Sequence, residues 1–131
     1  MAYKINLQQF EAALALNSSD RCSHFIDKIT QCEQLWGVKN SEGWLVPITP
    51  NNLEYFPVWP HPEYAQKSVD EHFKDYQAEE ISIQEFMGHW IPLFEEDNVK
   101  LAVFPDIHWE FWVMEAKDML KCLQDELAQY E

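Results

Sequence analysis

The chain has 131 residues, about the length of one domain, and its 9 Lys and Arg against 23 Asp and Glu give a net charge of −14. Hydrophobic residues make up 47% of the chain and aromatic residues 15%, which is too much apolar side chain for a disordered acidic tail. The shortage of Lys and Arg excludes a general nucleic-acid binder and argues against binding to anionic membranes. The composition therefore predicts one folded, acidic domain over residues 1–131.

The cysteines and the N-terminus indicate where such a protein works. Cys22, Cys32 and Cys122 are odd in number and have no C-x-x-C spacing, so we expect reduced thiols that pack as small hydrophobic side chains. The stretch Met1–Asp20 carries polar residues where a signal peptide would be apolar, and no apolar run reaches the roughly 18 residues that span a bilayer. We therefore expect a cytoplasmic protein without a membrane segment.

The first third of the chain predicts two short antiparallel helices followed by a hairpin. Apolar residues at helical spacing mark a helix around Leu7–Leu14, stop and cap signals follow at Asn17–Asp20, and a second helix is predicted for about Asp20–Glu33. The period then changes. Two apolar runs, Leu35–Val38 and Trp44–Ile48, flank a polar turn that contains glycine, which is typical of a β-hairpin.

The middle of the chain begins with a proline-marked segment from Tyr55 to Pro62. Val58 and Trp59 predict a strand, and Pro62 has the fixed φ that suits the first turn of a helix. Apolar residues at helical spacing continue this helix. A loop is then predicted for Asp75–Glu80.

A capping box opens the next helix, because Ser82 and the Glu85 three residues later can each satisfy a free N–H group. Apolar residues from Ile83 to Phe94 then form the strongest helical stripe in the chain. Pro92 interrupts this helix, since it lacks an N–H group and its ring crowds the carbonyl of the preceding turn. We therefore expect a kink near Trp90.

The last third of the chain predicts two strands and a helix. Leu101–Pro105 has the composition of a buried strand, and a turn at Asp106–His108 leads into a strand over Trp109–Val113 whose side chains alternate between two faces. A final amphipathic helix runs from about Ala116 to Tyr130. The interleaved elements predict an α+β fold with a mostly antiparallel sheet of about four to five strands, flanked by about five helices.

Several catalytic signatures are missing from the sequence. With three glycines, the chain contains neither the dinucleotide-binding G-x-G-x-x-G motif nor a Walker loop. It also lacks the G-x-S-x-G nucleophile elbow and the zincin motif H-E-x-x-H. These absences exclude the common nucleotide-loop folds, and we predict no cofactor and no metal.

Two His-x-Glu pairs leave an enzymatic alternative open. On a strand, side chains at i and i+2 point to one face, so such a pair could bind a metal or share a proton. Loop histidines hydrogen-bonded to neighbouring carboxylates explain the same pattern without a metal, and we favour this interpretation. The alternative function is a small metal-dependent or hydrolytic enzyme that uses His61, Glu63, His108 and Glu110.

The segment Phe56–Tyr64 is the most distinctive part of the sequence. Prolines on both sides of Trp59 restrict the backbone and fix where the indole projects. One interpretation is a rigid rim for a peptide groove. The other is a stiffened crossover with Trp59 in the core, which the usual burial of large aromatic side chains favours. The candidate binding residues of this segment and of the predicted last strand are Trp59, His61, Glu63, Tyr64, His108 and Trp112.

Five blocks of sequence carry a resemblance to a known family: Trp36, Gly43-Trp44, the block from Phe56 to Ala65, the helix Ile83–Leu93 and Leu101–Pro105. Together they resemble a family of small bacterial proteins called domain of unknown function 2750. The resemblance spans nearly the whole chain and implies a bacterial α+β domain with no established activity and no catalytic residue. We expect a non-enzymatic domain that binds a protein or peptide, with a homodimer as an alternative and neither nucleic acid nor membrane as a partner.

Overall fold

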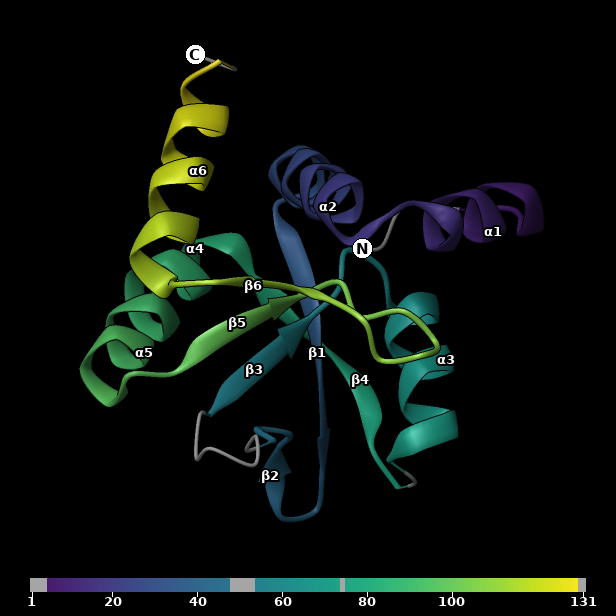
Figure 1. The fold of residues 1–131 in the computed structure, drawn as a ribbon. Coiled ribbons are helices and arrows are strands. Elements are labelled where there is room, and N and C mark those ends of the chain that lie inside the picture. Colours follow the sequence, from purple (N-terminus) through teal and green to yellow (C-terminus); the bar gives the residue numbers. More distant parts are fainter. Residues whose placement is uncertain (1–4, 48–53, 74, 130–131) are drawn as a thin grey trace.

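The computed structural model describes residues 5–47, 54–73 and 75–129, and its α-helices and strands are labelled in Figure 1. In chain order they are α1 (Leu7–Ala15), α2 (Ser18–Cys32), β1 (Gln34–Asn40), β2 (Gly43–Trp44), β3 (Tyr55–Val58), α3 (Pro62–His72), β4 (Gln77–Ser82), α4 (Ile83–Glu85), the π-helical turn η1 (Phe86–Trp90), α5 (Ile91–Asp97), β5 (Lys100–Val103), β6 (Trp112–Met114) and α6 (Ala116–Ala128). The fold is α+β, as the sequence predicts.

The strands form two sheets of three strands, β2-β1-β4 and β3-β5-β6, which are joined at one point. The N–H of Trp36 in β1 donates to the carbonyl of Trp59, just after β3, at 2.9 Å, and the reciprocal bond measures 2.8 Å. Among the described strands, every pair is antiparallel except β3 with β5. The prediction of a mostly antiparallel arrangement is confirmed, although the strands form two small sheets rather than one.

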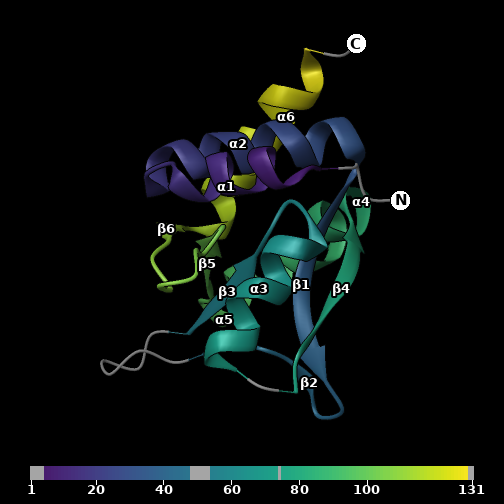
Figure 2. The ribbon, with the colours of Figure 1, turned by 90° about the vertical axis from the view of Figure 1, so that its right-hand side faces the viewer.

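Helices surround the joined sheets. In Figure 1, α5 and α6 stand at the left and α3 at the right, beside β4. Figure 2 shows α1 and α2 together across the top of the strands. Local signals set the helix starts, as predicted: Pro62 is the first residue of α3, and the Ser82 hydroxyl accepts the N–H of Glu85 at 3.1 Å. Within the described residues, no helix combines the length and apolar character needed to cross a membrane.

The predicted loop Asp75–Glu80 is wrong, because residues 77–82 form β4 and pair with most of β1. β4 lies at the edge of its sheet, and only Ile81 along it is buried. Polar residues fill the exposed positions, so the alternation that identifies a strand is missing. The predicted hairpin is confirmed, but β2 contains only Gly43 and Trp44. Its predicted end at Ile48, and the predicted helix end at Tyr130, lie outside the described residues.

The predicted strand Trp109–Val113 is wrong over its first half. β6 begins only at Trp112, because the preceding residues form a loop. Trp109 in this loop has φ of 63°, and Phe104 at its start has φ of 52°, and both values lie outside the extended conformation of a regular strand. The predicted strand therefore overlaps β6 only at Trp112 and Val113, and β6 extends one residue further to Met114.

The kink predicted near Trp90 takes the form of the π-helical turn η1. Pro92 has no N–H group to donate, and its ring would crowd the carbonyl of Gly88 four residues earlier. The helix widens instead, and the N–H of Ile91 donates to the carbonyl of Phe86, five residues before it. The extra residue in this turn sets the direction in which the Trp90 side chain leaves the helix.

Trp44 packs across β1 at Gly37, where the strand has no side chain. A Cβ atom built on Gly37 would lie 3.0 Å from Cζ3 of Trp44 and 3.4 Å from Cε1 of Phe56. The first distance is too short for a relaxed contact, because interiors are close-packed. The missing side chain therefore lets the hairpin fold its tryptophan onto the sheet.

We expect Gly37→Ala to lower the free energy of unfolding by about 1–3 kcal/mol, the usual cost of overpacking, because Trp44 must shift. Gly88→Ala is the matched control. Apart from the neighbouring residues and backbone of its own helix, its Cβ would have no atom within 4 Å, and alanine favours a helical position over glycine by about 1 kcal/mol. Urea unfolding of both variants beside the wild type measures the difference. Equal destabilisation by the two substitutions would contradict the packing argument.

Candidate functional site

The two aromatic segments singled out from the sequence meet in the structure. Nε1 of Trp59 donates to the carbonyl of Pro105 at 2.9 Å, and the Trp59 ring lies 6.0 Å from that of Trp109. Nε1 of Trp109 donates in turn to the hydroxyl of Tyr55 at 3.0 Å. β3 and the residues after it therefore support the stretch of residues 104–111, which we call the 104–111 loop.

Arg21, a buried cation at the start of α2, fastens the loop from another side. Its guanidinium donates to the carbonyl oxygens of Leu16, of Phe104 at 3.0 Å and of Glu110 at 2.9 Å. Nη1 also lies 3.8 Å from Oδ2 of Asp106. A buried charge is tolerated only where it is paired and hydrogen-bonded, and these contacts satisfy that condition. Both ends of the 104–111 loop are thus bound to one side chain.

Asp106 closes the loop on itself. Its Oδ1 accepts the backbone N–H groups of His108 and Glu110, both at 2.9 Å, and its own N–H donates to the carbonyl of Glu110 at 3.0 Å. The turn forces Trp109 into its left-handed conformation, which is uncommon for a bulky residue and persists only where surrounding contacts fix it. These hydrogen bonds therefore fix the backbone of the loop, including the positions of its exposed residues.

Three of the predicted binding residues lie inside this support. Trp59 and Tyr64 are fully buried, and the Tyr64 ring lies 4.7 Å from that of Phe104. His61 is buried at the N-cap of α3, where its Nδ1 accepts the N–H of Glu63 at 3.2 Å. The part these three can play in binding is to hold the 104–111 loop and the start of α3 in place.

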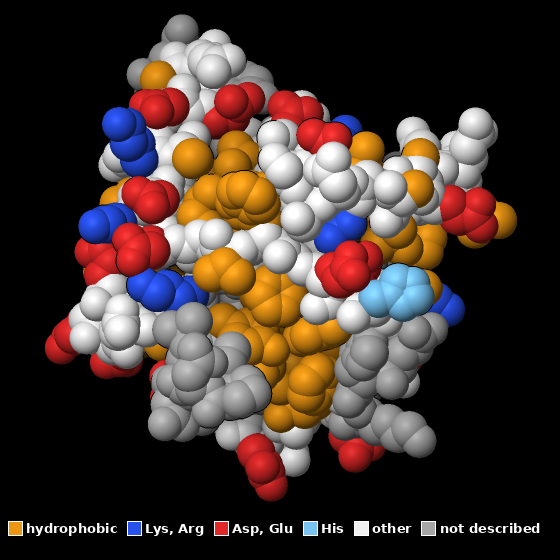
Figure 3. Space-filling view, viewed as in Figure 1, with side chains coloured by type: hydrophobic (Ala, Val, Ile, Leu, Met, Phe, Trp, Pro, Cys, Tyr) orange, Lys and Arg blue, Asp and Glu red, His pale blue; other side chains and the backbone are white. Residues whose placement is uncertain are grey.

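The other predicted binding residues reach the surface. Glu63 and His108 are exposed, and Trp112 on β6 is 41% exposed. Val113 beside it is 52% exposed, and β6 is the edge strand of its sheet. Trp112 and Val113 are successive strand residues and lie on opposite faces of this sheet edge. We call the exposed side chains of His108, Trp112 and Val113, which lie along the edge, the β6 strip. Figure 3 shows hydrophobic side chains gathered on this face of the molecule, over the strands.

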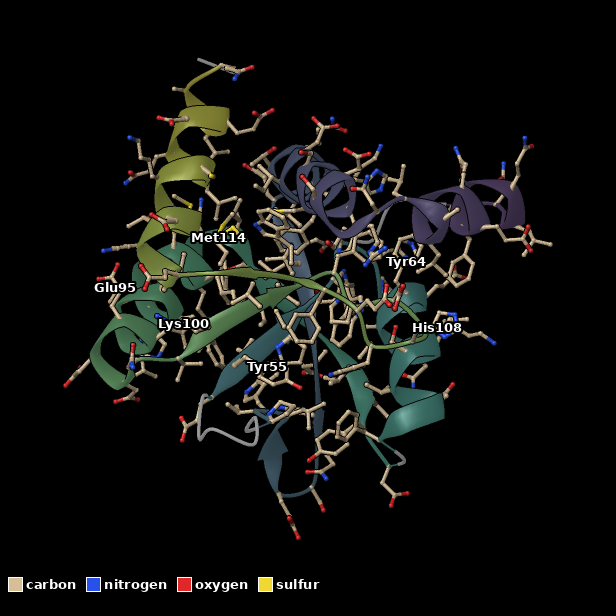
Figure 4. All side chains as sticks on the ribbon, viewed as in Figure 1. Tyr55, Tyr64, Glu95, Lys100, His108 and Met114 are labelled. Carbon is tan, nitrogen blue, oxygen red and sulfur yellow. The ribbon has the colours of Figure 1, made fainter. Side chains whose placement is uncertain are left out.

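The β6 strip extends across the front of the molecule. In Figure 4, His108 lies at the α3 side and Met114 at the α6 side, with the loop and β6 between them. Sequence reasoning missed Arg21, Asp106 and Val113 as parts of this region. For Asp106 a signal existed, because Asp after Pro favours a turn closed by its side chain. For Arg21 none existed, because an arginine in the first turns of a helix has the sequence signature of a surface residue.

The geometry assumed for the enzymatic alternative is not present at His108 and Glu110. These residues lie in the 104–111 loop rather than on a strand, so the i, i+2 argument does not apply to them. Nδ1 of His61 lies 3.9 Å from Oε2 of Glu63. Within the described ranges, no three His, Cys, Asp or Glu side chains are grouped to hold a metal ion.

The three cysteines are free thiols in buried or half-buried positions. Cys22 is buried, and Cys32 and Cys122 are half-buried. Burial raises the pKa of Cys22 to about 11, with Cys122 as the second cause, and burial likewise raises the pKa of Cys122. Since the thiolate is the reactive form, both side chains are poor nucleophiles at neutral pH. They serve packing between α2 and α6.

The sequence profile of a family described as "Protein of unknown function (DUF2750)" matches residues 22–123, which include the strands β1 to β6 and the 104–111 loop. The chain belongs to this family. The match begins one residue after Arg21 and leaves out α1. No curated protein matches the chain significantly. Membership in the family brings no activity with it, so the function has to be argued from the site.

We expect Arg21→Met to lower the free energy of unfolding by about 3–5 kcal/mol, because it leaves a buried carboxylate and carbonyl oxygens without the cation. Asp106→Ala removes the acceptor of two N–H groups, whereas Asp106→Asn keeps an amide oxygen in that place and should cost less. Lys117→Met, at an exposed lysine, is the control and should change little. Urea unfolding measures all four. An Arg21→Met variant as stable as the control would contradict this role.

His24 predicts a pH dependence of the same region. Its ring lies 6.0 Å from that of Phe104, and its buried Nε2 has no hydrogen-bond partner within the described part of the chain. Burial first, and the charge of Lys28 second, lower the pKa of His24 from its ordinary value of 6.5, while Asp27 opposes them. As the pH falls through 6.5, the unfolded chain therefore binds the proton more readily than the folded protein does.

We expect the contribution of neutral His24 to the free energy of unfolding to be fully present above pH 6.5 and to decrease as the pH falls below it. Urea unfolding at pH 7.5 and pH 5.5, which is above the carboxylate range, measures this change. His24→Gln should reduce the difference between the two pH values, because glutamine does not titrate. His89→Gln, at an exposed histidine, should leave the difference as it is in the wild type. An unchanged difference in His24→Gln would refute the assignment.

Proposed function

We propose that this protein is a non-enzymatic bacterial cytoplasmic domain that binds a protein partner through the β6 strip. The observation that carries the proposal is a pair of exposed apolar side chains, Trp112 and Val113, on an edge strand that follows a tightly held loop. Tryptophan is enriched among the residues that dominate binding energy. The backbone of β6 is already ordered by its pairing with β5, so it loses little conformational entropy when a partner covers it.

The edge of β6 adds a second kind of contact. β6 pairs with β5 on one side, and no described strand pairs with its other side. The backbone groups along that side can accept an extended segment of another chain as an added strand. His108 at one end of the strip supplies a polar contact beside the apolar ones. A peptide or a flexible loop of the partner would fit this geometry.

We expect Trp112→Ser to weaken partner binding by about 2 kcal/mol or more, which is roughly thirtyfold. Circular dichroism of the variant checks that it remains folded. Partners are captured with the immobilised full chain, identified, purified and titrated by calorimetry against the wild type and the variant. Leu7→Ser, at an apolar residue that is 71% exposed on α1, is the matched control and should bind as the wild type does.

The proposal is wrong if a purified partner binds Trp112→Ser and the wild type equally. A second copy of this chain is the other possible occupant of the strip, and sedimentation of the protein alone at several concentrations tests for such a dimer. A wild-type dimer that becomes a monomer in Trp112→Ser would assign the strip to a second copy of this chain instead.

A further inference from the structure

A second surface feature shares no residue with the β6 strip. A groove of about 380 Å³ opens between β2, β3 and α5, and we call it the aromatic groove. Four aromatic side chains line it: Trp44, Phe56, Trp90 and Phe94. Val46 and Leu93 add apolar surface that is 37% and 41% exposed. Isolated exposed apolar residues are ordinary, but two beside a concave aromatic wall indicate a surface that is covered in use.

The aromatic rings are arranged by one another. The Trp44 and Trp90 rings meet edge to face, with centroids 5.1 Å apart and planes at 80°. The Phe56 ring lies 5.9 Å from that of Trp44 and 5.4 Å from that of Trp90. Phe56 is buried, whereas both tryptophans are half-buried. The buried Phe56 ring therefore supports the two indoles from below, and both indoles keep part of their surface accessible to a ligand.

Trp90 occupies an unusual position in its helix. It ends the π-helical turn η1, and π-helical turns are rare and are found frequently at functional sites. Its Nε1 is buried and has no hydrogen-bond partner within the described residues, although buried donors nearly always have one. The turn that Pro92 imposes thus ends in an indole that lines the groove and carries a donor without an acceptor among the described residues.

The charges around the groove select for a cation. Glu54 and Asp97 are the charged side chains among its described lining residues, and both are exposed. Aromatic faces attract ammonium groups through their quadrupole. Trp44 already makes such a contact within the protein, since Nζ of Lys39 lies 5.2 Å from the centroid of its ring. Indole rings with carboxylates at the rim form a site that favours positive charge.

We propose that the aromatic groove binds a lysine side chain of a partner peptide, flanked by apolar residues. The ammonium group lies against the indoles of Trp44 and Trp90 and between the two carboxylates, and the flanking residues cover Val46 and Leu93. The net charge of −14 steers such a basic segment toward the protein. This assignment gives the protein a second binding surface and states the chemistry of its ligand, independently of the β6 strip.

The probe is the peptide acetyl-Leu-Lys-Leu-amide, titrated into the full ¹⁵N-labelled chain while the indole N–H signals are followed by NMR. The variants Trp44→Phe and Trp90→Phe assign the two signals of the groove, and Trp112→Phe assigns that of the β6 strip. We expect the signals of Trp44 and Trp90 to shift with peptide concentration. The same peptide with norleucine in place of lysine should bind at least about fivefold more weakly, since it keeps the apolar length and lacks the charge.

Two substitutions test the rim. Glu54→Gln and Asp97→Asn should each weaken binding of the lysine peptide about twofold or more, because they remove charge and keep shape. Asp125→Asn, at an exposed carboxylate of α6, is the matched control and should not change the affinity. Equal binding of the lysine and norleucine peptides would overturn the proposal, as would the absence of shifts at about 10 mM peptide.

Two further outcomes identify another occupant and also overturn it. Indole shifts of Trp44 and Trp90 that depend on protein concentration without peptide would assign the groove to a second copy of the chain. Shifts confined to Trp112 would place the peptide on the β6 strip. The reporters are separate, so failure at the aromatic groove leaves the proposed function of the strip standing, and the reverse holds as well.

Discussion

The buried guanidinium of Arg21 is the constraint on which the rest of the site depends. Two of the carbonyl oxygens that it binds, those of Phe104 and Glu110, would be available to a β-ladder if the last strand began earlier. Because these two carbonyl oxygens accept from the guanidinium, they make no hydrogen bonds between the described strands, and β6 starts only at Trp112. The backbone between them turns through the Asp106 cap and directs the Trp109 ring toward Trp59. One charge thus decides which aromatic residue is covered and which one is exposed.

The sequence predicts those parts of the fold that follow from short-range chemistry. Pro62 and Ser82 begin helices because φ restriction and a hydroxyl acceptor act within one turn, and Pro92 distorts its helix for an equally local reason. β4 was missed because only Ile81 faces the interior. Pairing with β1 holds this edge strand in place, so its own sequence needs no alternating apolar pattern.

The candidate site depends on long-range pairings and was predicted only in its parts. The distinctive segments around Trp59 and Trp112 were recognised from composition, but their meeting depends on the parallel register of Tyr55 with Lys100, for which local pattern has no signal. The same limit applies to Arg21, whose burial follows from carbonyl groups more than 80 positions away. Aromatic content indicated where function was to be sought, and the tertiary contacts determined which of those rings reach solvent.

β3 relates the two proposed surfaces to each other. Successive residues of a strand point to opposite faces, and Tyr55 and Phe56 do so here. Tyr55 contacts Trp109 under the 104–111 loop, whereas Phe56 packs beneath Trp90 in the aromatic groove. The pairing of Val103 with Trp112 puts Trp112 on the Phe56 face of the sheet, whereas Val113 pairs with Ala102 on the other face. The β6 strip lies along β6 and the aromatic groove lies at β3, with β5 between the two strands. A partner that uses both surfaces must therefore present two segments, one extended along β6 and one that carries a lysine at β3.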